Sequence, residues 1–172
     1  MDKKPVIYLS GPCRLLPDGK EQLNKAAELC SKYGFDTVAV PDNLFNHSSS
    51  KEEGIALAKE RLASIASCDI VIADTSDFRD LLEPYGETSM ELGYAWGLGK
   101  KLYCYMKDAR DCADRYPGTR HKNEKGTWVD ENGISFEPGP LNLMLNSPST
   151  VIEGTLEDAL KLAHTDFYGE EE

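Results

Sequence analysis

The chain has 172 residues, a formal net charge of −11 at pH 7 and 40% hydrophobic residues. This length predicts a single domain over residues 1–172 that can bury a core of its own. The acidic balance argues against binding to nucleic acid or to a membrane, because both surfaces are anionic. The sequence has no signal-peptide core and no run of about 18 apolar residues, and its five cysteines are irregularly spaced. We therefore expect a cytoplasmic protein without disulfides or a structural metal.

Short apolar runs alternate with segments of helical spacing along the chain. Strands are predicted for residues 6–9, 37–40, 69–74, 101–106 and 150–152. Helices are predicted for residues 20–33, 51–67, 88–98, 109–116 and 156–164. Residues 117–140 are rich in Gly, Pro and charge and are expected to form an irregular insertion. The alternation predicts an α/β fold: a single doubly wound, flavodoxin- or Rossmann-like sandwich with a five-stranded parallel sheet.

The turn after the first strand lies where such sheets bind ligands, outside the carboxyl ends of the strands. Its sequence, Ser10-Gly11-Pro12, matches neither a dinucleotide-binding fingerprint nor a phosphate-binding P-loop. Two interpretations stay open for it: a tight turn that brings the backbone close to a ligand, or only a turn that follows a strand.

The segment Thr88-x-x-Glu91 also allows two interpretations. It fits a capping box, with Thr88 as the N-cap and Glu91 reaching back to a backbone N–H. Alternatively, a carboxylate in the first helical turn is stabilised by the helix dipole and points into the ligand crevice. An ionised glutamate in that place can be the nucleophile of a retaining glycosyl transfer. The spacing alone favours the cap.

An ordered set of short motifs resembles the nucleoside 2-deoxyribosyltransferase family. Each motif alone is weak, but together they span about residues 6 to 145 in the family's order. They are Ile7-Tyr8-Leu9-Ser10-Gly11-Pro12, Pro41-Asp42-Asn43, Ala73-Asp74, Thr88-x-x-Glu91-Leu92-Gly93-Tyr94-Ala95, Leu98-Gly99-Lys100, Asp108-x-Arg110 and Pro140-Leu141-Asn142-Leu143-Met144-Leu145. This resemblance reverses the preference at Glu91 from cap to nucleophile.

The resemblance implies an enzyme that exchanges the base of a 2′-deoxynucleoside with a free nucleobase, without a cofactor or metal. Glu91 would form a covalent deoxyribosyl-enzyme, and the Tyr8 hydroxyl would orient it; otherwise Tyr8 is a core aromatic. Asn142 would reach across a subunit interface towards the sugar, which implies a homodimer or larger homo-oligomer. The further substrate-binding residues would be Gly11, Pro12, Asp42, Asn43, Asp74, Phe78, Glu87 and Met144. The rings of Tyr94 and Trp96 are expected in the core instead.

Two positions depart from the family pattern. Tyr85 stands where the family usually has an aspartate that handles the base, and Arg61 stands where another acidic residue is frequent. Nearby carboxylates are candidates to replace that aspartate: Asp77, Asp80, Glu83 and Glu87. Two alternative functions stay open. One is a hydrolase of 2′-deoxynucleoside 5′-monophosphates that holds the phosphate with Arg14 and Ser10, and the other is a non-catalytic nucleoside-binding module.

Overall fold

The computed structural model describes residues 4–39, 50–79 and 82–169, and at its centre is a parallel sheet in the order β2-β1-β3-β4-β7. The strands are β1 (Val6–Ser10), β2 (Asp36–Thr37), β3 (Ile70–Asp74), β4 (Lys101–Met106) and β7 (Thr150–Glu153). Because β1 pairs with β2 on one side and β3 on the other, the winding direction reverses between β1 and β3. Ligands of open α/β sheets bind at such a switch point. The predicted five-stranded parallel α/β fold is confirmed.

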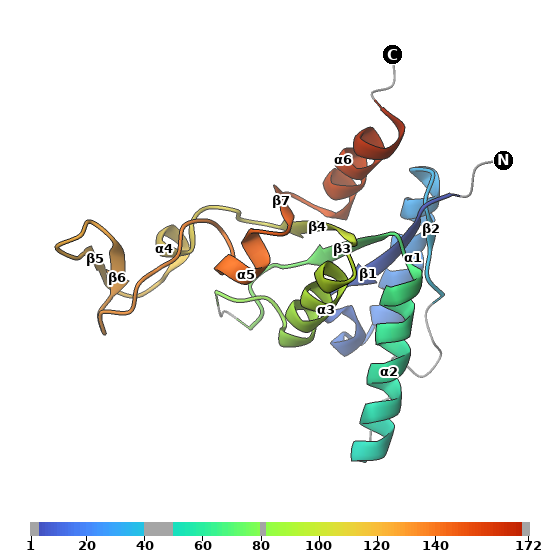
Figure 1. Ribbon diagram of the computed structural model, residues 1–172, viewed down its shortest axis with the longest axis horizontal. Helices are drawn as coiled ribbons and strands as arrows, with labels where there is room; N and C mark the ends of the chain where they lie inside the picture. Colours follow the sequence, from blue (N-terminus) through green and yellow to red (C-terminus); the bar gives the residue numbers. More distant parts are fainter. Residues whose placement is uncertain (1–3, 40–49, 80–81, 170–172) are drawn as a thin grey trace.

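Helices cover both faces of this sheet (Figure 1). One face carries α1 (Gly19–Lys32) and α6 (Leu156–Tyr168), and the other carries α2 (Lys51–Ser67), α3 (Gly86–Gly97) and the short α5 (Leu143–Asn146). The remaining helical turns are η1 (Pro12–Leu15) and α4 (Cys112–Arg115). Among the described residues, no helix is both long and apolar enough to span a bilayer.

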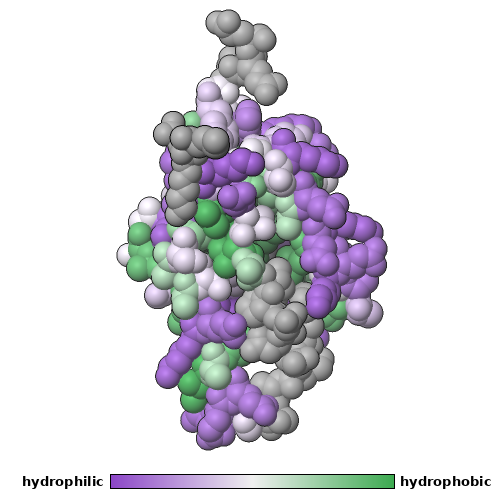
Figure 2. Space-filling model, turned by 90° about the vertical axis from the view of Figure 1, so that its right-hand side faces the viewer, coloured by the Kyte–Doolittle hydropathy of each residue, from purple (hydrophilic) through white to green (hydrophobic). Residues whose placement is uncertain are grey.

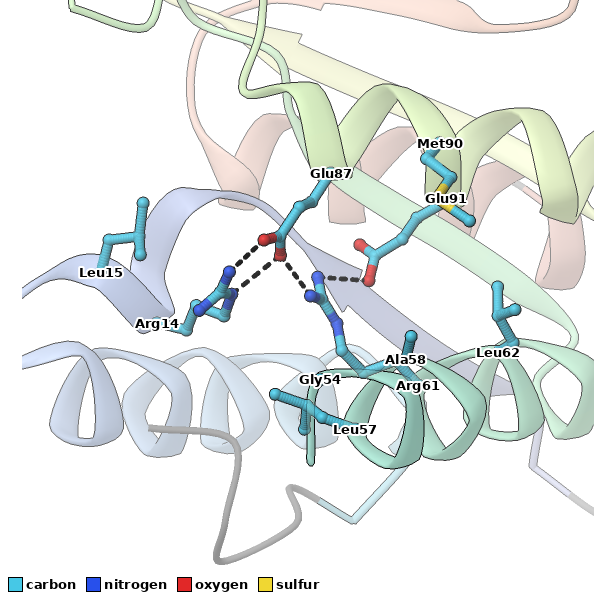
Figure 3. Close-up of a pocket in the computed structure, with 10 residues that line it drawn as sticks. All are labelled: Arg14, Leu15, Gly54, Leu57, Ala58, Arg61, Leu62, Glu87, Met90 and Glu91. Carbon is cyan, nitrogen blue, oxygen red and sulfur yellow. Dashed lines mark hydrogen bonds and ion pairs between the residues drawn. The ribbon is translucent and has the colours of Figure 1, made fainter. Parts of the chain in front are cut away.

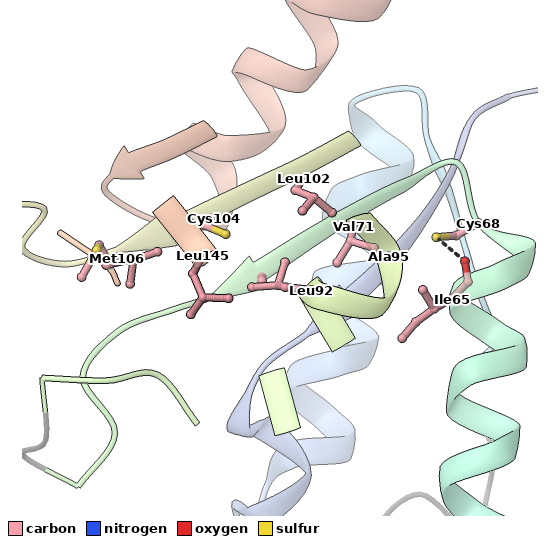
Figure 4. Close-up of a cluster of buried hydrophobic side chains, with 11 residues drawn as sticks. Ile65, Cys68, Val71, Leu92, Ala95, Leu102, Cys104, Met106 and Leu145 are labelled. Atoms are coloured by element: carbon pink, nitrogen blue, oxygen red, sulfur yellow. Dashed lines mark hydrogen bonds between the residues drawn. The ribbon is translucent and has the colours of Figure 1, made fainter. Parts of the chain in front are cut away.

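Strand alternation divides the core into two layers. Ile70 and Ile72 point to the side of α1 and α6, whereas Val71 and Ala73 point to the side of α2 and α3. Figure 4 shows the second layer, in which Leu92 of α3 packs over β3 and β4. Each fully buried large apolar side chain of this kind contributes about 1.5–3 kcal/mol. The same alternation sends the even-numbered residues of β1 towards α3.

The segment predicted to be irregular contains an antiparallel hairpin, so that part of the prediction is wrong. Strands β5 (Arg120–Lys122) and β6 (Trp128–Asp130) pair across it, and the hairpin extends away from the sheet (Figure 1). Its turn is fixed by Asn123, whose Oδ1 accepts the backbone N–H groups of Lys125 and Thr127. Such a side-chain bond to the local backbone is an Asx-type turn. Because polar residues form it, the hydrophobic pattern of the sequence does not reveal the hairpin.

The exposure of two aromatic residues on α3 contradicts the prediction that they lie in the core. Thr88, Glu91, Leu92 and Ala95 form its buried stripe at helical spacing. Tyr94 and Trp96 lie off that stripe and are 37% and 51% exposed, so they are not core residues. The face in Figure 2 shows hydrophilic residues mainly along its right-hand side and its lower end, with hydrophobic residues at the left edge and left of centre.

Candidate active site

Helix α3 begins two residues before the predicted N-cap. Its N-cap is Tyr85, so Glu87 is the carboxylate of the first turn and Glu91 lies in the second turn. Within the described part of the chain, the buried Thr88 hydroxyl has no hydrogen-bond partner and caps nothing. The capping-box interpretation, one of the two left open by the spacing, is therefore wrong, and so is the placement of Glu91 in the first turn. What positions Glu91 is tertiary contact.

Two hydroxyl groups of β1 hold the carboxylate of Glu91, which is only 4% exposed. The Tyr8 hydroxyl donates to Oε1 at 2.5 Å, and the Ser10 hydroxyl donates to Oε2 at 2.5 Å. Tyr8 and Ser10 are two residues apart on a strand, so both face the helix that carries Glu91. Burial, followed by the charge of Glu91, raises the pKa of Tyr8 above its ordinary value. Tyr8 therefore stays a hydrogen-bond donor over the physiological range.

A chain of alternating charges runs beside Glu91 (Figure 3). Nη2 of Arg61 lies 2.5 Å from Oε1 of Glu91, and Nη1 of Arg61 bonds Glu87. Glu87 is also clamped by Arg14, through Nε at 2.8 Å and through Nη2. Burial by itself would raise the pKa of Glu87, but the bonds from Arg14, Tyr85 and Arg61 outweigh it and lower the pKa to about 2. Charge-assisted bonds of this kind fix side chains from three separate elements in one arrangement.

A cavity of about 380 Å³ opens between these charges and helix α2. Arg61, Glu87 and Glu91 form its polar wall together with Arg14 from η1. The remaining lining is apolar. The residues that line the rest of the cavity are Leu15, Gly54, Leu57, Ala58, Leu62 and Met90. A concave site with apolar walls and a few fixed polar groups is typical of small-molecule binding.

Gly11, Pro12 and Asp74 lie elsewhere, around a smaller cavity of about 100 Å³ next to α1. Asp74 follows Ile72 at strand spacing and so faces the layer opposite Glu91. Gly11 has a φ of 154°, and a Cβ there would stand 3.1 Å from the Cβ of Asp74. The turn thus needs glycine to approach β3. The structure brings these three residues together, but not into the cavity of Glu91.

The remaining predicted residues are distributed around the α3 end of the site. The ring of Phe78 packs 4.8 Å from that of Tyr85, whose hydroxyl accepts a bond from Arg14 at 2.8 Å. Asn142 is the N-cap of α5, and its Nδ2 donates to Glu83 at 3.0 Å. Met144, on α5, is 65% exposed. Asp42, Asn43 and Asp80 lie outside the described residues.

Three polar residues joined to the Glu91 cluster were not among the site residues predicted for the transferase: Ser10, Arg14 and Arg61. The sequence analysis named Ser10 and Arg14 only as phosphate ligands of the alternative hydrolase, and Arg61 only as a departure from the family pattern. Ser10 carried a usable signal, because it follows Tyr8 by the strand period of two. Arg61 carried another, since it falls on the apolar stripe of its helix between Ala58 and Leu62. Arg14 lies just after the turn at the ligand-binding edge of the sheet, but its contact with Glu87 of α3 depends on the fold.

A family profile and one solved structure agree with this architecture. The sequence profile of the family described as "Nucleoside 2-deoxyribosyltransferase" matches residues 7–144. A solved 2-desoxiribosyltransferase from Leishmania mexicana is 28% identical with a TM-score of 0.71, covering 95% of this chain and 99% of that one. A 2-deoxyribosyltransferase from Bacillus psychrosaccharolyticus is 20% identical with a TM-score of 0.48, covering 77% of this chain and 98% of that one. A CMP N-glycosidase from Clostridium botulinum is 13% identical with a TM-score of 0.48, covering 92% of this chain and 98% of that one. A search of curated protein sequences found no significant match. The profile match over most of the chain shows that this protein belongs to the nucleoside 2-deoxyribosyltransferase family.

Proposed function

We propose that the protein transfers the 2-deoxyribosyl group of a 2′-deoxynucleoside from one nucleobase to another, with Glu91 as the nucleophile. The observation that carries this proposal is the Glu91 carboxylate, held at the wall of the 380 Å³ cavity by the hydroxyls of Tyr8 and Ser10. A nucleophile held in one rotamer before substrate arrives avoids an entropic cost in the reaction. Family membership supports the same chemistry.

The reaction has two displacements. In the first, a carboxylate oxygen of Glu91 bonds to the anomeric carbon while the C1′–N bond breaks, and the bonding electrons leave with the base, which takes up a proton. In the second, a nitrogen of the incoming base attacks the same carbon, loses its proton and releases the Glu91 carboxylate. Two inversions give net retention, as in retaining glycoside hydrolysis. Water in place of the second base gives hydrolysis, which we expect as a side reaction.

Glu87 is not suited to protonate the departing base. Its pKa of about 2 keeps it ionised near neutral pH, and its two oxygens already accept bonds from Arg14 and Arg61. We assign Glu87 the role of fixing these two guanidinium groups at the cavity. Their remaining N–H groups then donate hydrogen bonds to the base, which stabilise the charge that develops on it as the C1′–N bond breaks.

A second subunit is part of the proposal. Leu141 and Leu145 are buried in the core, but Leu143 and Met144 between them are 58% and 65% exposed. Exposed apolar residues next to a site are typical of an interface. We propose a homodimer or larger homo-oligomer in which Asn142 is contributed to the neighbouring site.

The test is an exchange assay. The protein is incubated with a 2′-deoxynucleoside and a different free base, and the products are separated by chromatography. We expect a new deoxynucleoside with the wild type and none with Glu91→Gln, which keeps the side-chain shape but is no nucleophile. Glu21→Gln, a change in an exposed ion pair with Lys25, is the matched control and should keep full activity.

Other outcomes would contradict the proposal. Hydrolysis of a deoxynucleoside 5′-monophosphate without base exchange would indicate an N-glycosidase. Nucleoside binding without any cleavage would indicate a binding module.

A further inference from the structure

The cavity beside Glu91 has walls of two kinds. Leu57, Ala58 and Leu62 of α2 present an apolar surface, and Met90 of α3 adds to it. Such a surface suits the flat face of a nucleobase, because stacking a ring there removes apolar area from water. The polar part of the lining adjoins this surface: Arg61 extends from the same helix α2 towards Glu87, which also binds Arg14 (Figure 3). Because these polar side chains adjoin the apolar surface, they face the edge of a base that stacks on it.

The charges of this wall balance. The cavity lining contains two arginines, Arg14 and Arg61, and two glutamates, Glu87 and Glu91. A phosphate in this place would bring up to two negative charges into a cluster that already sums to zero, next to the Glu91 carboxylate. A neutral ligand with hydrogen-bond acceptors adds no such repulsion. The balance thus favours the edge of a base over a 5′-phosphate at this wall.

One donor on the wall lacks a partner. Nη1 and Nη2 of Arg61 bond the two glutamates, whereas its Nε–H is buried without a hydrogen-bond partner among the described residues. An unpaired buried donor is destabilising, and such groups are rare in native proteins. Because this atom is buried, an acceptor of the ligand can bond it only after a shift of the Arg61 side chain. A ligand with an amino group at that position would place a donor against a donor.

We propose that Arg14 and Arg61 make this site selective for oxo nucleobases over amino nucleobases. A guanidinium group has donors and no acceptor. The 6-oxopurines present two neighbouring acceptors, O6 and N7, whereas adenine presents an amino group beside N7. Uracil and thymine differ from cytosine in the same way at position 4. Both oxygens of Glu87 already accept arginine bonds, so the wall offers donors to the base. This specificity deepens the proposed function and rests on it.

The experiment measures binding without turnover. Deoxyinosine and deoxyadenosine, which differ at position 6 and in the hydrogen on N1, are titrated calorimetrically into the Glu91→Gln variant. We expect deoxyinosine to bind about tenfold tighter, the lower part of the range for an arginine that reads a base edge. Deoxyuridine and deoxycytidine, the second matched pair, should show the same order. Adding Arg61→Met or, separately, Arg14→Met should bring the ratio towards one, and two separate arginine variants guard against the misfolding of either.

Several results would overturn the proposal. Equal affinities or a preference for the amino base would refute the selectivity, as would an undiminished ratio in both arginine variants or no binding of any nucleoside. A much tighter binding of deoxyinosine 5′-monophosphate than of deoxyinosine, lost in the arginine variants, would assign the arginines to a phosphate instead. The proposed transfer reaction is judged separately by the exchange assay with the wild type. Base exchange without a preference between oxo and amino bases would refute the proposed selectivity but not the transfer function. Selective binding without any base exchange would refute the transfer function but not the selectivity.

Discussion

Removal of the Tyr8 hydroxyl tests how the structure activates Glu91. The Tyr8→Phe variant keeps the ring but loses the 2.5 Å bond to Oε1, so among the described residues the carboxylate keeps its contacts with Ser10 and Arg61. A hydrogen bond to a charged group contributes about 1.5–3 kcal/mol. If the bond is needed in full to orient the attacking oxygen, the rate of deoxyribosyl-enzyme formation should fall by about 10- to 150-fold.

A second buried tyrosine provides the matched control. The Tyr103 hydroxyl donates to Oδ2 of Asp166 at 2.6 Å, on the opposite face of the sheet from Glu91. Tyr103→Phe therefore removes the same kind of bond, and both variants should lose a similar free energy of unfolding, about 1 to 3 kcal/mol. Only Tyr8→Phe should lose transfer activity.

The assay is a single-turnover measurement of base release from a 2′-deoxynucleoside, with urea unfolding measured in parallel. An unchanged rate constant in Tyr8→Phe would refute the orienting role and leave Tyr8 as a packing residue. Equal loss of activity in both variants would assign the effect to stability instead.

Four further outcomes are expected. Glu91→Ala should abolish both exchange and hydrolysis while circular dichroism shows an intact fold; activity near that of the wild type would defeat the nucleophile assignment. Because the pKa of Glu87 is lowered from 4.5 to about 2, Glu87 should stabilise the fold above pH 4.5 and lose that effect as the pH falls towards 2. The stability advantage of wild type over Glu87→Gln should therefore shrink across this window in urea titrations, and a constant difference would contradict the ion-pair network. Gly11→Ala should cost about 1–3 kcal/mol of unfolding free energy, since a Cβ would crowd Asp74 at a positive φ, whereas Gly93→Ala, in open space on α3, should be neutral or stabilising. Sedimentation should show at least a dimer at assay concentration, and Met144→Glu should weaken this association. A fully active monomer would refute the proposal that two subunits share each active site.

The sequence by itself determined the fold and the identity of the central carboxylate. Apolar runs of strand length alternate with helical periodicity, and this local pattern is enough to predict a parallel sheet with helices on both faces. The order of the motifs, more than any one of them, directed attention to Glu91 and Tyr8. Their contact at 2.5 Å agrees with the residue pair expected from the family resemblance.

Only the tertiary structure decided what surrounds Glu91. Arg14, Arg61 and Glu87 come from three elements separated by 47 and 26 positions, and no local period relates them. Their ion pairs depend on how α2 and α3 pack against the end of β1, which long-range contacts set. The start of α3 was misplaced for the same reason. Thr88 and Glu91 have the spacing of a capping box, but burial of the face that they share with Leu92 turned both away from the helix end. The local sequence favours a helix start at Thr88, but the larger free energy of tertiary packing outweighs this preference.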